Sequence, residues 1–118
     1  MKYVDGFLLV VPKKNLAAYR TLAQKAGKVW MEHGALDYHE CVGEDVQTGF
    51  GIPFTKRVKA GKGDLVVFSW ITYKSRAHRD KVNKKVMQDP RLLAMCGKPM
   101  PFDMKSMSHG GFEVLVDL

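Results

Sequence analysis

Glu40 has the surroundings that best suit acid–base chemistry in this chain of 118 residues. Residues 35–43 are predicted to form a strand, in which alternation places Leu36, Tyr38 and Val42 on the face that carries Glu40. Apolar neighbours remove water from a carboxylate and make it a better proton acceptor, so Glu40 is a candidate general base. The alternative interpretation is a structural glutamate that pairs with a lysine or arginine at the strand end.

The opposite face of the same strand carries atoms that can bind metals. Asp37, His39 and Cys41 alternate along the strand and therefore share that face. Ligands on one strand do not close a site, and the sequence has no second element of this kind, so we predict no metal. His39 is a second catalytic candidate, and the alternative is a surface histidine beside a buried cysteine. Cys96 is predicted to be a core residue.

Polar groups also gather in the approach to the last predicted strand. Asp103, Lys105 and His109 lie in a stretch that contains several Pro and Gly residues and could border a cavity. Asp103 is therefore the third catalytic candidate, and His109 is a candidate for ligand contact. The alternative is turn chemistry, with Asp103 capping its own backbone and Gly110-Gly111 forming a bulge.

The strand that must position these groups is predicted over residues 65–73. This stretch is rich in β-branched and aromatic residues and follows a turn-forming cluster. Both of its faces are largely apolar, so it needs cover on both sides. One face carries Val66, Phe68, Trp70 and Thr72, and the other carries Leu65, Val67, Ser69, Ile71 and Tyr73. Together with Tyr38 and His109, Phe68 and Trp70 are candidates to line a pocket, although such residues also serve as plain core.

The N-terminal half supplies a strand, a helix and a long connection. The predicted strand at 2–11 is apolar on both faces and ends at Pro12. Asn15 is expected to cap a helix whose apolar positions recur every three or four residues, and Gly34 ends it. Residues 44–62 lack periodicity, and we expect this connection to be the one segment long enough to act as a lid.

The C-terminal half supplies two helices and a strand. Ser75 is expected to cap a helix that runs to about Gln88, and Asp89-Pro90 begins a short second helix. Gly110-Gly111 is expected to introduce the last strand, in which residues 112–118 alternate.

The order strand, helix, strand, strand, helix, strand predicts a fold and an assembly. We expect one α+β domain over residues 1–118, a ferredoxin-like split βαβ sandwich with an antiparallel sheet and both helices on one face. About six large apolar side chains then remain on the other face, and leaving them exposed forgoes roughly 10 kcal/mol. We therefore expect a second copy to cover this face, giving a dimeric α/β barrel. The alternative is a monomer in which the 44–62 connection folds back over the sheet.

Composition limits the possible classes of partner. Hydrophobic residues make up 46% of the chain and charged residues 26%, as in globular proteins, and no apolar run is long enough for a membrane span. Without a recognisable secretion signal we expect a cytoplasmic protein with two reduced cysteines and no cofactor.

A net charge of +7 raises the alternative of an anionic polymer such as RNA as partner. The candidates for such contact lie on the second predicted helix: His78, Lys81, Lys84 and Lys85. The central strand lacks the stacking aromatics that RNA-recognition modules use, which argues against nucleic acid. A solvated helix face explains the lysines equally well.

Several short motifs recur in the order known from one bacterial family. They include Asp5-Gly6-Phe7, Glu40-Cys41, residues 66–71, Arg79-Asp80, residues 85–91, residues 100–103 and residues 110–113. The chain closely resembles the YbaA-like family, domain of unknown function 1428, and departs from it mainly at residues 49–57. The resemblance implies the dimeric α/β barrel superfamily and no established activity. Relatives by fold include cofactor-independent monooxygenases and small-ligand binders, which is analogy at the level of the fold.

The main functional hypothesis is therefore a homodimer that binds a small apolar or aromatic molecule. A cofactor-independent, monooxygenase-like reaction with Glu40 as base is one option within it. The binder of anionic polymers and a purely structural or adaptor dimer are the alternatives.

Overall fold

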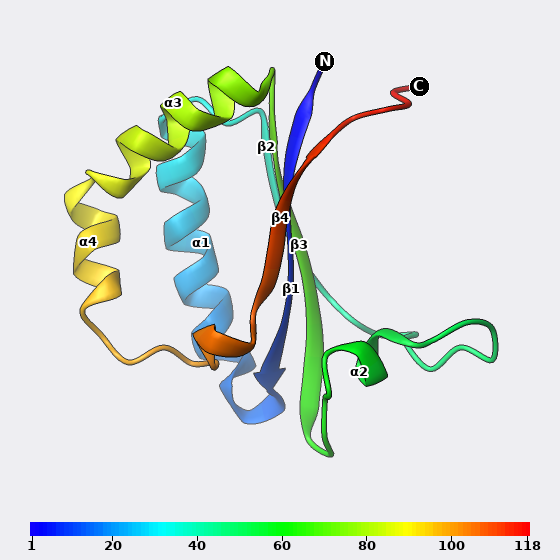
Figure 1. Ribbon diagram of the computed structural model, residues 1–118. Helices are drawn as coiled ribbons and strands as arrows, with labels where there is room; N and C mark the ends of the chain where they lie inside the picture. Colours follow the sequence, from blue (N-terminus) through cyan, green and yellow to red (C-terminus); the bar gives the residue numbers. More distant parts are fainter.

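The structure, a computed structural model, describes all 118 residues and contains one four-stranded antiparallel sheet (Figure 1). The strands are β1 (Tyr3–Pro12), β2 (Asp37–Val42), β3 (Asp64–Tyr73) and β4 (Ser108–Glu113). The helices are α1 (Leu16–Glu32), α2 (Phe54–Arg57), α3 (Arg76–Met87) and α4 (Pro90–Cys96), with 3-10 turns η1 (Lys13–Asn15) and η2 (Met104–Ser106). The sheet order β2-β3-β1-β4 confirms the predicted ferredoxin-like α+β fold.

Strand alternation divides the sheet into two faces with different cover. β1 pairs with β3 along its whole length, from Tyr3 opposite Tyr73 to Pro12 opposite Asp64. One face packs against α1, α3 and α4 and buries two groups of core side chains, one around Tyr73 and Val82 and one around Leu9 and Val67 (Figure 1). Odd-numbered residues of β1 and β3 therefore point toward the helices.

The other face, which we call the open face, has no helix layer of its own. It carries Val4, Leu8, Val10, His39, Cys41, Val66, Phe68, Trp70, Thr72 and Phe112, placed there by alternation and pairing. Its aromatic rings contact each other, with Phe68 and Trp70 centroids 5.6 Å apart. Phe68 is nonetheless 46% exposed and Phe112 is 63% exposed. The two apolar faces expected for the central strand are thus present, and the chain itself covers only one of them well.

Helix α1 differs from its prediction at its N-terminal cap. Asn15 makes no capping hydrogen bond with its side chain; its Nδ2 donates instead to the Pro101 carbonyl, 3.1 Å away, because the turn η1 already leads the chain into the helix. Gly27 lies within the helix and is buried against the Tyr38 ring. A Cβ at position 27 would lie 2.7 Å from Tyr38 Cδ1, so the missing side chain admits β2 directly onto the helix.

The caps of α3 and α4 are as predicted. The Ser75 hydroxyl accepts from the His78 backbone N–H at 3.1 Å and begins α3. Asp89 accepts from the Arg91 backbone N–H at 2.9 Å, and Pro90 occupies the first turn of α4.

The last strand lies earlier in the chain than predicted. β4 ends at Glu113, and Gly110 and Gly111 lie inside the strand instead of introducing it. Tyr3 accounts for the glycine at position 111 inside the strand, because a Cβ there would lie 2.3 Å from the Tyr3 hydroxyl. Residues 114–118 leave the sheet after the Val114 N–H donates to the Lys2 carbonyl at 2.9 Å. The predicted alternation over residues 112–118 was therefore wrong.

The connection between β2 and β3 lies on the open-face side, away from the main helices (Figure 1). Its short helix α2 brings Phe54 to Phe68, with ring centroids 6.4 Å apart, and Phe54 remains 50% exposed. The connection therefore covers only part of the open face, and it cannot close over a site on the helix side. No helix of this structure has the length and apolar character that crossing a bilayer requires.

Candidate functional site

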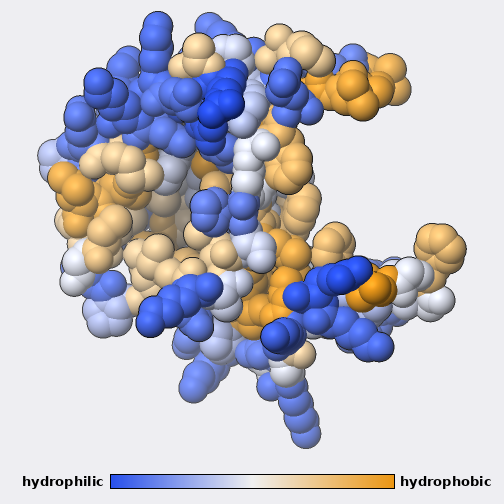
Figure 2. Space-filling model, in the orientation of Figure 1, coloured by the Kyte–Doolittle hydropathy of each residue, from blue (hydrophilic) through white to orange (hydrophobic).

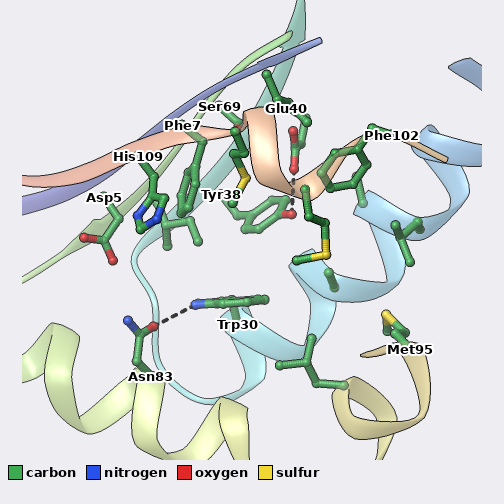
Figure 3. A pocket seen from close by; sticks show the side chains of 18 of the residues that line it. Asp5, Phe7, Trp30, Tyr38, Glu40, Ser69, Asn83, Met95, Phe102 and His109 are labelled. Carbon is green, nitrogen blue, oxygen red and sulfur yellow. Dashed lines mark hydrogen bonds between the residues drawn. The ribbon is translucent and has the colours of Figure 1, made fainter. Parts of the chain in front are cut away.

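A cavity of about 720 Å³ lies between the helix-side face of the sheet and helices α1, α3 and α4. Most of its lining is apolar, and five of the side chains are methionines from α3, α4 and the segment that leads to β4: Met87, Met95, Met100, Met104 and Met107. Figure 3 shows aromatic rings and methionine sulfur atoms converging on the same space. Methionine adapts to irregular shapes, so this wall can fit more than one apolar ligand.

Glu40 projects into this cavity between two tyrosines. The Tyr19 hydroxyl donates to Glu40 Oε1 at 2.7 Å, and the Tyr38 hydroxyl donates to Glu40 Oε2 at 2.8 Å (Figure 3 shows the second bond). Tyr19 comes from α1 and Tyr38 from β2, so the carboxylate joins the helix to the edge strand. We call these three residues the carboxylate clamp.

The two phenols of the clamp titrate above their ordinary range. Burial first, and then the adjacent Glu40, raise the pKa of both Tyr19 and Tyr38 well above the ordinary value of 10.0. Both phenols therefore remain protonated donors toward Glu40 at neutral pH. Phe102 supports Tyr19 edge-on, with ring centroids 5.5 Å apart, which holds its hydroxyl in direction.

A second polar group lies along the same cavity. The Arg79 Nη1 of α3 donates to Asp5 Oδ1 of β1 at 2.8 Å, and its guanidinium lies 4.9 Å from the Tyr3 ring centre. Burial raises the pKa of Asp5, and Arg79 opposes that shift. This ion pair fastens α3 to the central strand of the sheet.

Asn83 completes this second group. Its Oδ1 accepts from Trp30 Nε1 at 3.0 Å and from the Tyr73 hydroxyl at 3.2 Å (Figure 3 shows the first bond). Asn83 therefore ties α1, α3 and β3 together at the end of the cavity away from Glu40. Every buried side-chain polar atom of the structure has a hydrogen-bond partner, so both polar groups are satisfied internally.

Comparison with known proteins identifies the family of the whole chain. Residues 2–104 match the family described as "Protein of unknown function (DUF1428)". The chain is also 48% identical over 117 residues to the uncharacterized protein YbaA of Escherichia coli strain K12, with 99% of each chain covered. The chain belongs to the DUF1428 family. The uncharacterized protein YbaA of Shigella flexneri is similar to the same degree.

Two solved structures share the fold of this DUF1428 protein. Rv0793 from Mycobacterium tuberculosis matches with a TM-score of 0.60 and 13% identity, over 99% of this chain and 98% of that one. An uncharacterized NIPSNAP domain protein from Burkholderia xenovorans matches with a TM-score of 0.58 and 11% identity, over 95% and 93%. At such low identity the likeness shows the fold alone, and it agrees with the ferredoxin-like topology.

The structure brings together only some of the residues that the sequence singled out. Glu40, Tyr38 and His109 line the cavity of this DUF1428 protein, and the His109 ring stacks 6.1 Å from Phe7 at its exposed edge. Phe68 and Trp70 do not line it and lie on the open face, which corrects the predicted pocket. Alternation separates two faces correctly, but it does not reveal which face the helices cover.

The remaining chemical candidates are not part of the carboxylate clamp, although His39 and Cys96 also belong to the cavity lining. The His39 ring stacks on Trp70 at 4.9 Å on the open face. Asp103 is exposed and accepts from the Lys105 N–H at 3.0 Å, which is the turn geometry given as its alternative. Cys41 and Cys96 are both exposed, so the prediction of buried cysteines was wrong. No three His, Cys, Asp or Glu side chains gather in a metal-binding arrangement.

The basic residues of α3 do not form one surface. Lys81, Lys84 and Lys85 are exposed, whereas His78 is half-buried. The His78 ring lies 6.0 Å from Tyr73, and its Nδ1 accepts from the Lys74 N–H at 3.0 Å. His78 therefore caps the end of β3 and is not part of the lysine arc.

Sequence reasoning missed the partners of Glu40 and the second polar group. Tyr19 belongs to the predicted apolar stripe of the first helix, which placed it near the sheet but gave no sign of its hydrogen bond. Asp5 and Arg79 lie 74 residues apart and meet only through the crossing of β1 and α3. A buried acidic residue in an otherwise apolar strand is the one signal that could have found Asp5.

Proposed function

We propose that this protein binds a small, mainly apolar molecule in the cavity between the sheet and the helices. The observation that carries the proposal is an apolar cavity of about 720 Å³ into which the carboxylate clamp projects. Ligand sites are typically apolar hollows of this size with a few fixed polar groups. The flexible methionines supply the apolar contact, and the clamp supplies one oriented polar group.

The clamp supports binding better than proton abstraction. Both Glu40 oxygens already accept a hydrogen bond from a phenol, at 2.7 and 2.8 Å. Such a carboxylate is fixed in place and suited to orienting a ligand. A base must take up a whole proton, which would weaken both phenol hydrogen bonds, whereas accepting a hydrogen bond from a ligand leaves them in place.

We further propose that the protein works as a homodimer through the open face. Figure 2 shows a hollow on this side, between the C-terminal segment and the segment around α2, with apolar side chains at its edges. Phe50 is 92% exposed and Leu115 is 87% exposed at these two edges. Monomers rarely leave so much apolar surface in contact with water, and a second copy offers a surface of the same chemistry.

The two tryptophans of the chain allow both proposals to be tested in one sample. Trp30 lines the cavity and Trp70 lies on the open face, so their indole N–H resonances report on different events. Trp70→Phe assigns the two peaks. Naphthol is expected to shift the Trp30 peak at constant protein concentration, and dilution is expected to shift the Trp70 peak.

A cavity-filling pair of variants controls for non-specific binding. Ala26 lines the cavity, and Ala18 is exposed on the same helix. Ala26→Phe is expected to weaken naphthol binding at least about tenfold by occupying ligand volume, while Ala18→Phe leaves it unchanged. Equal affinity in both variants, or no movement of the Trp30 peak, would contradict the proposed site.

A further inference from the structure

The carboxylate clamp leaves an imbalance of hydrogen-bonding groups inside the cavity. Each tyrosine uses its only hydroxyl hydrogen on Glu40, so neither has a donor left for a ligand. The carboxylate and the two phenol oxygens still have unused lone pairs. The carboxylate clamp itself therefore presents acceptors only, and Ser69, opposite Glu40 in the pairing of β2 with β3, adds a hydroxyl that can donate or accept.

The charges of the cavity show the same imbalance. Asp5 is paired with Arg79, whereas Glu40 forms no ion pair with any cation of the chain. The acidic and basic residues that line the cavity are Asp5, Glu40 and Arg79, which sum to −1 with the histidines neutral. The unbalanced charge belongs to Glu40.

Resting on the proposed function, we infer that the ligand is an apolar molecule whose polar end donates hydrogen bonds, an amine or a phenol. Such a group gives Glu40 the donor or cation that the chain does not supply. A ligand carboxylate at this position would face a like charge and the four oxygen atoms of the clamp, none with a free hydrogen. A buried acceptor without a donor is costly, so the clamp disfavours ligands that carry a carboxylate.

Four naphthalene compounds of similar size separate these possibilities by calorimetry: naphthol, naphthylmethylamine, methoxynaphthalene and naphthoate. We expect naphthol and the amine to bind at least about tenfold more tightly than the ether, because only they donate to Glu40. Naphthoate is expected to bind most weakly. A greater affinity of the amine than of naphthol would identify charge as the larger contribution.

Glu40→Gln tests whether Glu40 sets this preference. The glutamine amide keeps the shape and adds a donor, so naphthoate should gain affinity relative to naphthylmethylamine, at least about tenfold. Glu44→Gln is the matched control. Glu44 is exposed in the segment after β2, so this substitution removes the same charge outside the cavity. The control is expected to leave the order of affinities unchanged.

The outcomes separate this inference from the proposed function. Equal binding of all four compounds, or tightest binding of naphthoate, would overturn the inferred preference for hydrogen-bond donors. The proposal that the cavity binds an apolar molecule would still stand. A donor preference that persists in Glu40→Gln would overturn the assignment to Glu40. Binding of none of the four would remove both.

A second variant keeps the test informative if Glu40→Gln does not fold. Tyr19→Phe removes one internal donor and frees a lone pair of Oε1 while the carboxylate stays. Donating ligands should then bind as tightly as before or more tightly, and naphthoate should remain excluded. Gain of naphthoate binding in this variant would contradict the inference.

Discussion

The two faces of the sheet are built from the same strands and differ in how their apolar residues are covered. The helix-side face carries Asp5, Ser69 and Glu40 among its apolar residues, and the helices enclose them around a cavity. The open face carries a row of aromatic rings with no buried ionic group and little cover from its own chain. Enclosed polar groups suit selective binding of a small molecule, whereas a continuous apolar face suits contact with another protein surface.

The largest expected effect comes from placing a charge on the open face. Phe68→Asp should weaken self-association at least about a hundredfold, because an unpaired charge would be buried between two copies. Sedimentation velocity at micromolar concentration measures this. Within one chain Phe68 is 46% exposed, so the variant should still fold.

Leu93→Asp is the control for that variant. Leu93 is 57% exposed on α4, on the helix side of the molecule. Its replacement by aspartate should therefore leave the proposed dimer intact. A wild-type particle of the monomer mass, 13.3 kDa, would refute the proposed dimer and remove the functional contrast between the faces.

Gly27→Ala tests how tightly the helix-side face is packed. Alanine favours a helix, but here its Cβ would lie 2.7 Å from the Tyr38 ring, so we expect a loss of about 2 kcal/mol in unfolding free energy. Urea denaturation measures it. In a Tyr38→Ala background the clash is gone, and the same change at Gly27 should become neutral or stabilising; an unchanged loss would show that Tyr38 is not the cause.

Removing the clamp donors should have a smaller effect at neutral pH. Tyr19→Phe and Tyr38→Phe are each expected to lower stability by about 1–2 kcal/mol, because each removes a hydrogen bond to a carboxylate. Neither should alter the sedimentation of the proposed dimer.

The same tyrosines predict a dependence on alkaline pH. Their pKa is raised in the folded protein, so above pH 10.0 the unfolded chain loses phenol protons while the folded one retains them. Their contribution to stability is complete below pH 10.0 and declines as pH rises further. The double Phe variant should therefore show a shallower alkaline decline than wild type, and parallel curves would contradict this.

The smallest effect is expected from a residue that belongs to neither face. Asp89 caps α4 and contacts Arg91 and His33, and these hydrogen bonds lower its pKa. Its stabilising contribution is present above the ordinary value of 3.8 and is lost as pH falls through the lowered pKa. Asp89→Asn should reduce the melting temperature slightly at pH 7 and match wild type in strong acid, without changing the dimer or naphthol binding.

The fold was predictable because periodicity and capping residues act locally. The strand predicted over residues 65–73, the Ser75 and Asp89 caps and the order of elements followed from neighbouring residues alone. The position of Gly111 inside the last strand was not predictable, because this glycine makes room for the Tyr3 hydroxyl and does not form a turn. That contact joins opposite ends of the chain, and no local pattern reports it.

The candidate site was predictable in part for the same reason. Glu40 and Tyr38 share a strand face, so their common direction followed from alternation. Tyr19 and the Asp5–Arg79 pair depend on how helices cross the sheet, which sequence spacing does not contain. Alternation alone does not reveal whether Phe68 and Trp70 point toward the helices or lie on the open face. That depends on which face of the sheet the helices cover.

The central place of β1 also governs when the molecule can form during synthesis. This first strand pairs with β3, through Tyr3 and Tyr73, and with β4, through Tyr3 and Glu113. During synthesis, one edge of this strand can pair once β3 has been made, whereas the other edge stays unpaired until residues 108–113 have left the ribosome. Pairing between strands that lie far apart in the sequence slows folding and leaves an apolar strand exposed in the meantime. We therefore expect chaperones to protect the emerging chain from aggregation.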